Sequence, residues 1–414
     1  MSCFINNTSE NGVNQFAPFS IIAKPVGSTC NLRCKYCYYI DKASELGYSG
    51  KTIMTLETLE NYIKKYILSH PEGHRVDFIW HGGEATILPL GFYKKAVELQ
   101  IKYSSNRIIS NSLQTNGTLL NDEWCRFLKK NNWLVGISID GDMDVHDEYR
   151  KTETGKGSFL RVMRGIRLLN RYGIEWNAMA VVNDYNSEYP LDFYHFFKGI
   201  GCKYLQFTPI VERFEQNSTY SDANSDIMPF SVKPEKWGHF LCTIFDEWVK
   251  SDVGEVFVQI FDATLANWVK VVPGLCSLGD NCGASLVMEH NGDIFSCDHF
   301  VSHQYRIGNI NTDSIREIIN NNCHQIFAKN KTDSLPEECN NCQWKILCNG
   351  GCQKDRFVPS VSGKKSINYL CKGYKHFFEH TASAMQFMKN EILNRRPPSN
   401  IMRSGILNNQ ESTI

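Results

Sequence analysis

The chain has 414 residues, and its 44 basic and 44 acidic side chains give a formal net charge of zero. A composition of 42% hydrophobic and 21% charged residues is typical of a folded globular protein and excludes a disordered or fibrous one. Balanced charge argues against partners such as duplex nucleic acid or an anionic membrane surface, and the length predicts two or three domains.

The sequence contains 16 cysteines, too small a fraction for a disulfide scaffold. The amino-terminal residues lack the basic and then apolar pattern of a signal peptide, and no apolar run is long enough to span a bilayer. We therefore expect a cytoplasmic protein. In that reducing compartment, spaced cysteines are more often metal ligands or redox centres than crosslinks.

From residue 17 to 260, short β-branched runs alternate with longer amphipathic ones, the pattern of repeated βα units. The expected strands begin at Pro18, Arg75, Arg107, Trp133, Glu175 and Lys203. The expected helices cover 55–70, 91–105, 121–132, 158–173 and 189–201. Six units are too few to close an eight-fold barrel, so the sequence predicts the α/β class and a partial (β/α)6 TIM-like barrel. In such barrels the chemistry lies at the carboxyl ends of the strands.

The pattern changes after Lys233, where a long helix to Ser251 and an apolar run from Glu255 are expected. Beyond Leu275 the chain is dense in cysteine and its elements are expected to be short. We expect a disordered or loosely attached segment over 1–16, the barrel over 17–260, a cysteine-rich domain over 261–390 and a carboxyl-terminal tail over 391–414, loosely ordered after Arg395.

Cys30, Cys34 and Cys37 form a C-x3-C-x2-C motif directly after the first expected strand. Three thiolates can hold three irons of a cubane cluster and leave the fourth iron open to a small ligand, whereas structural zinc takes four protein ligands. An incomplete zinc site and three unrelated thiols are the alternatives. The second expected strand ends in His81-Gly82-Gly83-Glu84-Ala85, where glycines allow close backbone approach to a ligand or simply make a turn.

Eight further cysteines occur at ligand spacing in the carboxyl-terminal part: Cys276, Cys282, Cys297, Cys339, Cys342, Cys348, Cys352 and Cys371. Eight ligands suffice for two fully coordinated cubane clusters, and a pair of zinc ribbons is the alternative. Spacing alone does not decide how they pair. The other five, Cys3, Cys125, Cys202, Cys242 and Cys323, have no partner at ligand spacing.

The three-cysteine motif, with the aromatic Tyr36 in its last gap, resembles the defining loop of radical S-adenosylmethionine (SAM) enzymes. The resemblance implies that the open iron binds SAM and that reductive cleavage yields a 5′-deoxyadenosyl radical, the cofactor carrying the radical chemistry. It also implies that the Gly82-Gly83 stretch binds the methionine amino group, although Ala85 stands where the family usually has proline.

The later cysteines resemble the SPASM domain, which carries two auxiliary [4Fe–4S] clusters. The resemblance implies three clusters in all. By analogy, the first auxiliary cluster would be held by Cys276, Cys282, Cys297 and Cys352. The second would be held by Cys339, Cys342, Cys348 and Cys371.

Stretches such as KPVGSTCNLRCKYCYY, SLQTNGTLL, LQFTPIVER and FSCDHF resemble the anaerobic sulfatase-maturating enzymes, and the resemblance covers residues 17 to about 388. It implies oxidation of a cysteine or serine in an unfolded sulfatase to Cα-formylglycine. The implied partners are a polypeptide with a Cys/Ser-x-Pro/Ala-x-Arg motif and a low-potential electron donor such as flavodoxin or ferredoxin. The implied proton acceptor is Asp298, directly after Cys297. The implied cofactor contacts are Tyr36, Gly83, Ser138, Arg150 and Val211.

Without the resemblance, Arg150 could equally be part of a solvated basic patch, and Asn116-Gly117 could be a plain turn rather than part of a pocket with Gln114 and Thr115. A SPASM-type maturase that crosslinks ribosomal peptides is an alternative enzyme, disfavoured because only about 16 residues precede the first expected strand. A non-catalytic iron–sulfur or zinc-binding scaffold is an alternative of another class.

Overall fold

The computed structural model describes residues 19–48, 52–214 and 226–404, and Cys3 lies outside these ranges. The chain forms two compact units that interleave in sequence. The first unit comprises 1–137, 150–175 and 281–330, and the second comprises 138–149, 176–280 and 331–414. The four-part division expected from the sequence remains a prediction.

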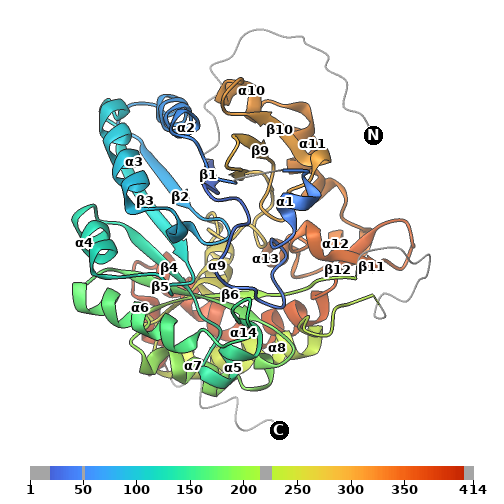
Figure 1. Ribbon diagram of the computed structural model, residues 1–414. Helices are drawn as coiled ribbons and strands as arrows, with labels where there is room; N and C mark the ends of the chain where they lie inside the picture. The colour runs from blue at the N-terminus through green and yellow to red at the C-terminus, as the bar shows by residue number, and fades with distance from the viewer. Residues whose placement is uncertain (1–18, 49–51, 215–225, 405–414) are drawn as a thin grey trace. The chain divides into compact units, whose positions relative to one another are not determined.

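The strands of the first unit lie in the order β10-β9-β8-β1-β2-β3-β4 (Figure 1). Strand β1 pairs in parallel with both β2 and β8, β2 pairs in parallel with β3, and β3 with β4. Strands β8, β9 and β10 form antiparallel pairs. Their bounds are β1 (Ser20–Ala23), β2 (Arg75–Trp80), β3 (Ile108–Thr115), β4 (Leu134–Ser138), β8 (Ser285–Met288), β9 (Asp293–Phe295) and β10 (Arg306–Asn309).

The helices of the first unit are α1 (Lys42–Glu45), α2 (Leu56–Leu68), η1 (Ala85–Ile87), α3 (Leu90–Tyr103), α4 (Asp122–Lys130), α6 (Phe159–Tyr172), η3 (His303–Tyr305), α10 (Ile315–Ile319) and α11 (Asn322–Asp333). Helix α2 begins where the sequence predicts, because the Thr55 side chain accepts a hydrogen bond from the Thr58 amide at 3.1 Å. Helix α6 ends at Gly173, whose φ of 58° lies in the left-handed region.

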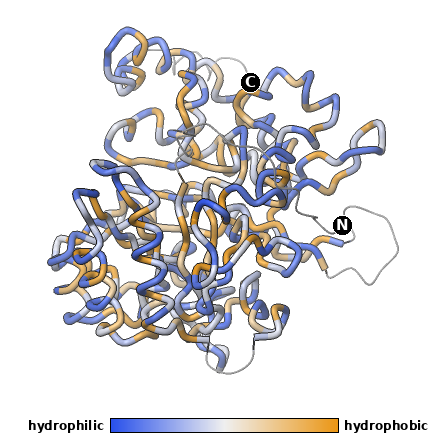
Figure 2. The backbone as a smooth tube through the Cα atoms, turned by 90° about the horizontal axis from the view of Figure 1, so that it is seen from above, coloured by the Kyte–Doolittle hydropathy of each residue, from blue (hydrophilic) through white to orange (hydrophobic). Residues whose placement is uncertain are grey.

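Aromatic side chains fix α2 and α3 on the sheet of the first unit. Trp80 of β2 is fully buried and contacts Tyr62 of α2 and Tyr93 of α3, with ring centroids 6.1 and 5.7 Å apart. Figure 1 shows both helices beside β2 and β3. Hydrophobic and hydrophilic stretches alternate along the chain in Figure 2, as amphipathic elements require.

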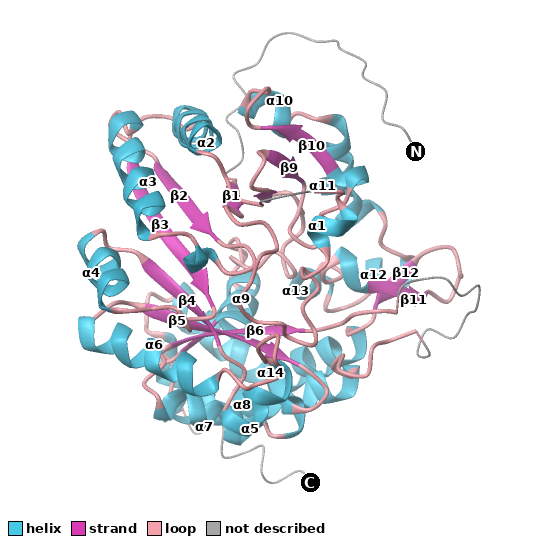
Figure 3. Ribbon diagram, in the orientation of Figure 1, coloured by secondary structure: helices cyan, strands magenta, loops and turns pink. Residues whose placement is uncertain are grey.

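The second unit contains the parallel strands β5 (Trp176–Val182), β6 (Tyr204–Pro209) and β7 (Phe257–Val258). It also contains a two-stranded antiparallel sheet of β11 (Arg356–Pro359) and β12 (Ser366–Asn368), labelled in Figure 3. Its helices are α5 (Met143–Tyr149), η2 (Asn186–Glu188), α7 (Pro190–Gly199), α8 (Pro234–Ser251), α9 (Gln259–Trp268), α12 (Glu337–Asn340), α13 (Lys345–Cys348), η4 (Gln353–Asp355), α14 (Cys371–Leu393) and η5 (Pro398–Arg403). The six expected strands are present as β1 to β6, and the α/β class with a parallel sheet is confirmed.

Two expectations for the carboxyl-terminal part are wrong. Its elements are not all short, because α14 runs for 23 residues and packs closely on α8, where a Cβ at Gly373 would lie 2.2 Å from the Pro234 carbonyl oxygen. The tail is also not loose up to residue 404, since Arg396 and Asn400 hold the Glu391 carboxylate and Ile401 is fully buried. A local sequence pattern does not reveal these contacts between distant segments.

Candidate active site

The three-cysteine loop follows β1 in the first unit. The Leu32 amide donates to the Cys30 sulfur at 3.4 Å, and the Cys37 amide donates to the Cys34 carbonyl at 3.1 Å. Desolvation of the sulfur, together with the negative charges of Glu84 and Cys37, raises the pKa of Cys30 to about 11. Thiols in such surroundings become ligands when bound metal cations stabilise the thiolates, so the loop fits an iron cluster.

The glycine stretch after β2 packs against the backbone of the same loop. A Cβ on Gly83 would lie 2.2 Å from the Thr29 carbonyl oxygen, so only glycine fits there. The Gly83 amide donates to the Gly27 carbonyl at 2.8 Å, and the Glu84 amide donates to the Thr29 carbonyl at 2.9 Å. In this structure the glycine is required by close contact between two protein segments, and its contact with a cofactor remains a prediction.

Glu84 is a site residue whose role the sequence did not reveal. Its buried carboxylate accepts from the Thr86 amide at 3.0 Å, from the Thr115 hydroxyl at 2.6 Å and from the Asn116 amide at 2.7 Å. The Asn116 side chain in turn donates to the Asn31 side chain at 2.9 Å. Glu84 therefore ties the ends of β2 and β3 to the three-cysteine loop. The available signal was an acidic residue directly after Gly82-Gly83, where the chain is expected to turn at the end of a buried strand.

Arg150 lies beside the three-cysteine loop, against the ring of Tyr36. Both are buried, and the Arg150 guanidinium lies 5.5 Å from the centre of the Tyr36 ring. Burial raises the pKa of Cys37, while the charge of Arg150 opposes that effect, which places the guanidinium within electrostatic reach of the sulfur. The solvated basic patch is excluded. A buried cation next to an aromatic ring can bind a carboxylate and stack an adenine.

Asp298 follows β9 and lies in a polar cage within the first unit. Its carboxylate forms an ion pair with Lys24 and accepts a hydrogen bond from the Tyr38 hydroxyl at 2.7 Å. Burial alone would raise the pKa of Asp298, but the positive charge of Lys24, aided by His81 and His299, holds that pKa well below its usual range. Asp298 is therefore an unprotonated carboxylate at neutral pH.

Lys24 is the second residue that the sequence did not single out. Its side chain is 1% exposed, and its Nζ lies 3.2 Å from the centre of the Tyr39 ring. The Tyr39 hydroxyl donates to the Glu289 carboxylate. A lysine directly after a buried strand was the available signal, because a buried charge requires a partner.

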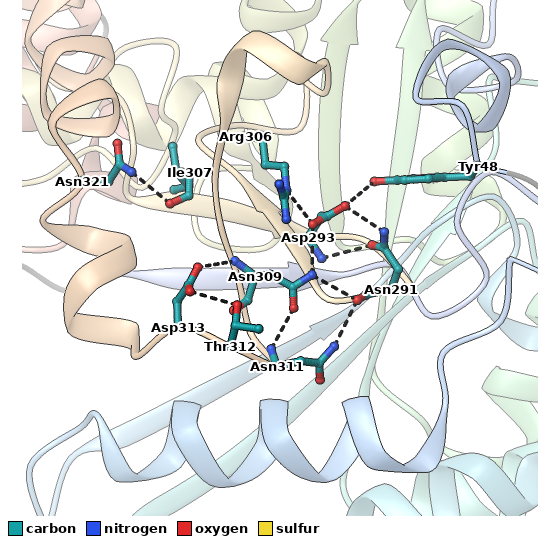
Figure 4. A network of polar contacts seen from close by, with 10 residues as sticks. All are labelled: Tyr48, Asn291, Asp293, Arg306, Ile307, Asn309, Asn311, Thr312, Asp313 and Asn321. Carbon is teal, nitrogen blue, oxygen red and sulfur yellow. Dashed lines mark hydrogen bonds and ion pairs between the residues drawn. The ribbon is translucent and has the colours of Figure 1, made fainter. Parts of the chain in front are cut away.

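The hairpin that presents Cys297 and Asp298 is held by the carboxylate of Asp293 (Figure 4). This carboxylate accepts from Tyr48 at 3.1 Å, from Asn291 at 2.7 Å, from Arg306 at 2.6 Å and from Asn309 at 3.0 Å. Burial would raise the pKa of Asp293, but these donors outweigh burial and lower it. The network fixes the strands from which the segment of Asp298 emerges.

Four of the predicted ligands line one cavity of about 240 Å³ in the second unit: Cys339, Cys342, Cys348 and Cys371. Burial, together with the charges of the other three thiolates, raises the pKa of Cys348 to about 12, so the four sulfurs interact electrostatically across the cavity. The cavity and its donors fit a cubane cluster. Within the described ranges, no three His, Cys, Asp or Glu side chains converge as the ligands of a single metal ion would.

The other predicted ligand set is divided between the units. Cys282 and Cys297 belong to the first unit, and Cys276 and Cys352 to the second, so this set remains a prediction. Of the predicted cofactor contacts, Ser138 is the last residue of β4, and the buried Val211 follows β6 in the second unit. No described helix is long and apolar enough to cross a membrane.

Comparisons with known proteins also indicate a SAM-binding part followed by an iron–sulfur domain. The radical SAM superfamily model matches residues 25–197, and the model of an iron–sulfur cluster-binding domain, SPASM, matches residues 280–343. The serine-type anaerobic sulfatase-maturating enzyme of Bacteroides thetaiotaomicron is 52% identical over 94% of this chain and 96% of its own length. The cysteine-type enzyme of Clostridium novyi is 33% identical over 91% of this chain and 99% of its own length.

Solved structures agree. Native anSMEcpe with bound AdoMet and the Cp18Cys peptide matches with a TM-score of 0.80 and 33% identity, over 91% of this chain and 100% of that chain. Streptococcus suis SuiB bound to S-adenosylmethionine, at 14% identity and a TM-score of 0.58 over 86% of this chain and 77% of that chain, shares the fold. SAM and iron–sulfur clusters are therefore the cofactors. The extent of the identity decides the family: the chain belongs to the anaerobic sulfatase-maturating enzymes, which are radical SAM enzymes with a SPASM domain.

Proposed function

We propose that this enzyme oxidises a serine or cysteine of a sulfatase polypeptide to Cα-formylglycine without oxygen. The observation that carries the proposal is the charged Asp298 carboxylate, held by Lys24 and Tyr38 directly after the predicted cluster ligand Cys297. Oxidation of an alcohol to an aldehyde, or of a thiol to a thioaldehyde that water then hydrolyses with loss of hydrogen sulfide, requires a proton acceptor next to the target residue. The 52% identical relative is of the serine type, which makes serine the target to test first.

The predicted ligand sets would hold three [4Fe–4S] clusters. Cys30, Cys34 and Cys37 would hold the cluster with an open iron, and the eight later cysteines would hold two auxiliary clusters. When bound, SAM and these clusters supply the 5′-deoxyadenosyl radical that removes the substrate hydrogen atom and an acceptor for the second electron. Tyr36 and Arg150 would bind the adenine and carboxylate of SAM, with Gly83, Ser138 and Val211 as further contacts.

The polar cage determines how Asp298 acts as a base. Lys24 keeps the carboxylate ionised, and burial raises the pKa of Tyr38 far above its usual value, so Tyr38 remains a hydrogen-bond donor. A carboxylate does not deprotonate an ordinary alcohol. The hydroxyl proton of the substrate radical becomes strongly acidic as the second electron leaves, so it passes to Asp298 together with the loss of that electron. Proton transfer to Asp298 therefore belongs to the second oxidation step.

We further infer that the partners are an extended sulfatase segment with a Cys/Ser-x-Pro/Ala-x-Arg motif and a low-potential electron donor such as flavodoxin or ferredoxin. We also propose a cytoplasmic location, because the thiolate ligands of the enzyme survive in a reducing compartment. Membership of the sulfatase-maturating family favours this reading over a peptide-crosslinking maturase.

The proposed function is tested with two matched peptides, one with Ser-x-Pro-x-Arg and one with Cys-x-Pro-x-Arg. The reduced, reconstituted enzyme is incubated anaerobically with SAM and each peptide, and aldehyde formation is followed by mass spectrometry. We expect an aldehyde on at least the serine peptide. SAM cleavage without an aldehyde on either peptide would reject the function and favour the peptide maturase.

A further inference from the structure

Lys354 joins two segments of the second unit that are distant in sequence. Its Nζ donates a hydrogen bond to the Val211 carbonyl and lies 2.9 Å from a carboxylate oxygen of Glu212. The Asp355 carboxylate lies 3.4 Å from the same Nζ.

The first segment is the turn after β6 that carries the predicted cofactor contact Val211. The Ile210 amide donates to the Val182 carbonyl at 2.9 Å, and the Glu212 amide donates to the Ser231 hydroxyl at 2.9 Å. Val211 itself is 2% exposed. The residues on both sides of Val211 are therefore anchored, and its carbonyl is held by the side chain of Lys354.

The second segment begins at the predicted cluster ligand Cys352, two residues before Lys354. The Asn368 side chain donates to the Cys352 carbonyl at 3.2 Å, and the Tyr369 amide donates to the Asp355 carbonyl at 2.7 Å. This loop is thus fixed to the strand that leads into another predicted ligand, Cys371.

A second contact joins the same two segments. The Arg213 guanidinium lies 4.9 Å from the centre of the Phe357 ring, and that ring stacks on Tyr369 with centroids 5.5 Å apart. Two independent contacts between the same pair of segments indicate that their relative position is specified.

We propose that Lys354 is a positioning residue that fixes the backbone of Val211, a predicted SAM contact, against the loop of Cys352, so that SAM affinity depends on this contact within the second unit. This inference rests on the proposed function through the roles assigned to Val211 and Cys352. Because the carbonyl carbon and the Cβ of a residue are both bonded to its Cα, anchoring the Val211 carbonyl restricts where its side chain can lie.

The test compares Lys354→Met with Lys365→Met in the full-length, anaerobically reconstituted enzyme. Methionine keeps the aliphatic length of lysine and removes the charge and the donor. We expect Lys354→Met to weaken SAM binding, measured by equilibrium dialysis, by about tenfold, as the loss of a charge-assisted hydrogen bond implies. We also expect its iron content to stay unchanged. Lys354→Arg, which keeps the charge and donors, should recover most of the affinity.

Lys365 is the matched control, since its Nζ donates to the carbonyls of Asp333 at 2.8 Å and Leu335 at 2.9 Å in the same unit. We expect Lys365→Met to bind SAM as the wild type does. The proposal would be overturned if Lys354→Met bound SAM as tightly as the wild type does, or if both substitutions weakened SAM binding equally. It would also be overturned if Lys354→Met lost about four irons while its SAM affinity stayed unchanged.

A second variant and a comparison with wild-type aldehyde formation complete the test. If Lys354→Met fails to fold, Glu212→Gln removes the ion pair and should weaken SAM binding by about two- to fivefold, and unchanged affinity would overturn the proposal. Failure of the proposed function has a different signature, because the wild type would then make no aldehyde while the difference in SAM affinity between the variants persists.

Discussion

Lys24 and Asp298 form an ion pair in which the lysine side chain is 1% exposed and the aspartate side chain 18% exposed. The pair joins the end of β1 to the segment after β9, and the Tyr38 hydroxyl donates to the second carboxylate oxygen at 2.7 Å. The first unit thus holds a charged carboxylate beside the segment that carries the three-cysteine loop.

Asp298→Asn removes the proposed proton acceptor and nearly preserves its shape. We expect the variant to cleave SAM in the presence of peptide while aldehyde formation falls by at least about a hundredfold, the usual effect of losing a general base. Quantifying 5′-deoxyadenosine and aldehyde in the same reaction separates SAM cleavage from aldehyde formation. The exposed Asp192→Asn serves as the control, and wild-type aldehyde yield from Asp298→Asn would remove Asp298 as the base.

Lys24→Met leaves the Asp298 carboxylate without its buried partner. Breaking a buried ion pair from one side costs about 3 kcal/mol or more, so we expect the free energy of unfolding in urea to fall by that amount. The double variant Lys24→Met/Asp298→Asn no longer buries an unpaired charge and should recover most of the loss. Additive losses in the double variant would show that the two side chains do not interact energetically.

Gly83→Ala should disrupt the contact between the glycine stretch and the three-cysteine loop. The new Cβ would lie 2.2 Å from the Thr29 carbonyl oxygen, so the backbone must shift. We expect the variant to lose SAM binding, measured by equilibrium dialysis. Gly91→Ala in α3 meets nothing within 4 Å and should bind SAM normally, with equal or slightly higher stability. Normal SAM affinity in Gly83→Ala would contradict the packing argument.

Cys348→Ala removes one predicted ligand from the four-cysteine cavity of the second unit. We expect the iron content of the reconstituted enzyme to fall from about twelve to about eight per chain, because the fourth iron of this cluster would lose its ligand, whereas SAM completes the open iron of the three-cysteine loop. The buried Cys242 of α8 supplies the control, since Cys242→Ala should retain all the iron. Full iron in Cys348→Ala would exclude this cavity as a cluster site.

His380 of α14 and Asp246 of α8 give the fold a measurable pH dependence. The two side chains lie 2.7 Å apart, and the hydrogen bond with Asp246 raises the pKa of His380. Because that pKa is higher in the folded state, the stabilisation is fully present below pH of about 6.5 and is lost as the pH rises through the folded-state pKa. We expect His380→Gln to lower the Tm at pH 5.5 and to match the wild type at pH 8.5. A Tm difference independent of pH would contradict this assignment.

The sequence by itself determined the ligand loop and the class of fold. The spacing of Cys30, Cys34 and Cys37 is a local property, and the alternation of β-branched and amphipathic runs predicted the strands that the structure contains. The later cysteines predicted a second metal-binding domain, and their resemblance to SPASM indicated that it binds iron–sulfur clusters. Their assignment to separate sets came from the resemblance, and only the set of Cys339, Cys342, Cys348 and Cys371 gains support from a shared cavity.

The tertiary structure decided which groups become the partners of the buried charged side chains. Lys24 with Asp298, Glu84 with Asn116 and Lys354 with Val211 are contacts between segments far apart in the chain, and sequence periodicity carries no information on them. The structure also showed that Gly83 is required by the Thr29 carbonyl, and that α14 is one long helix packed on α8. Ligand spacing and hydrophobic period are local and can be read along the chain, whereas the pairing of buried charges depends on how the chain folds back on itself.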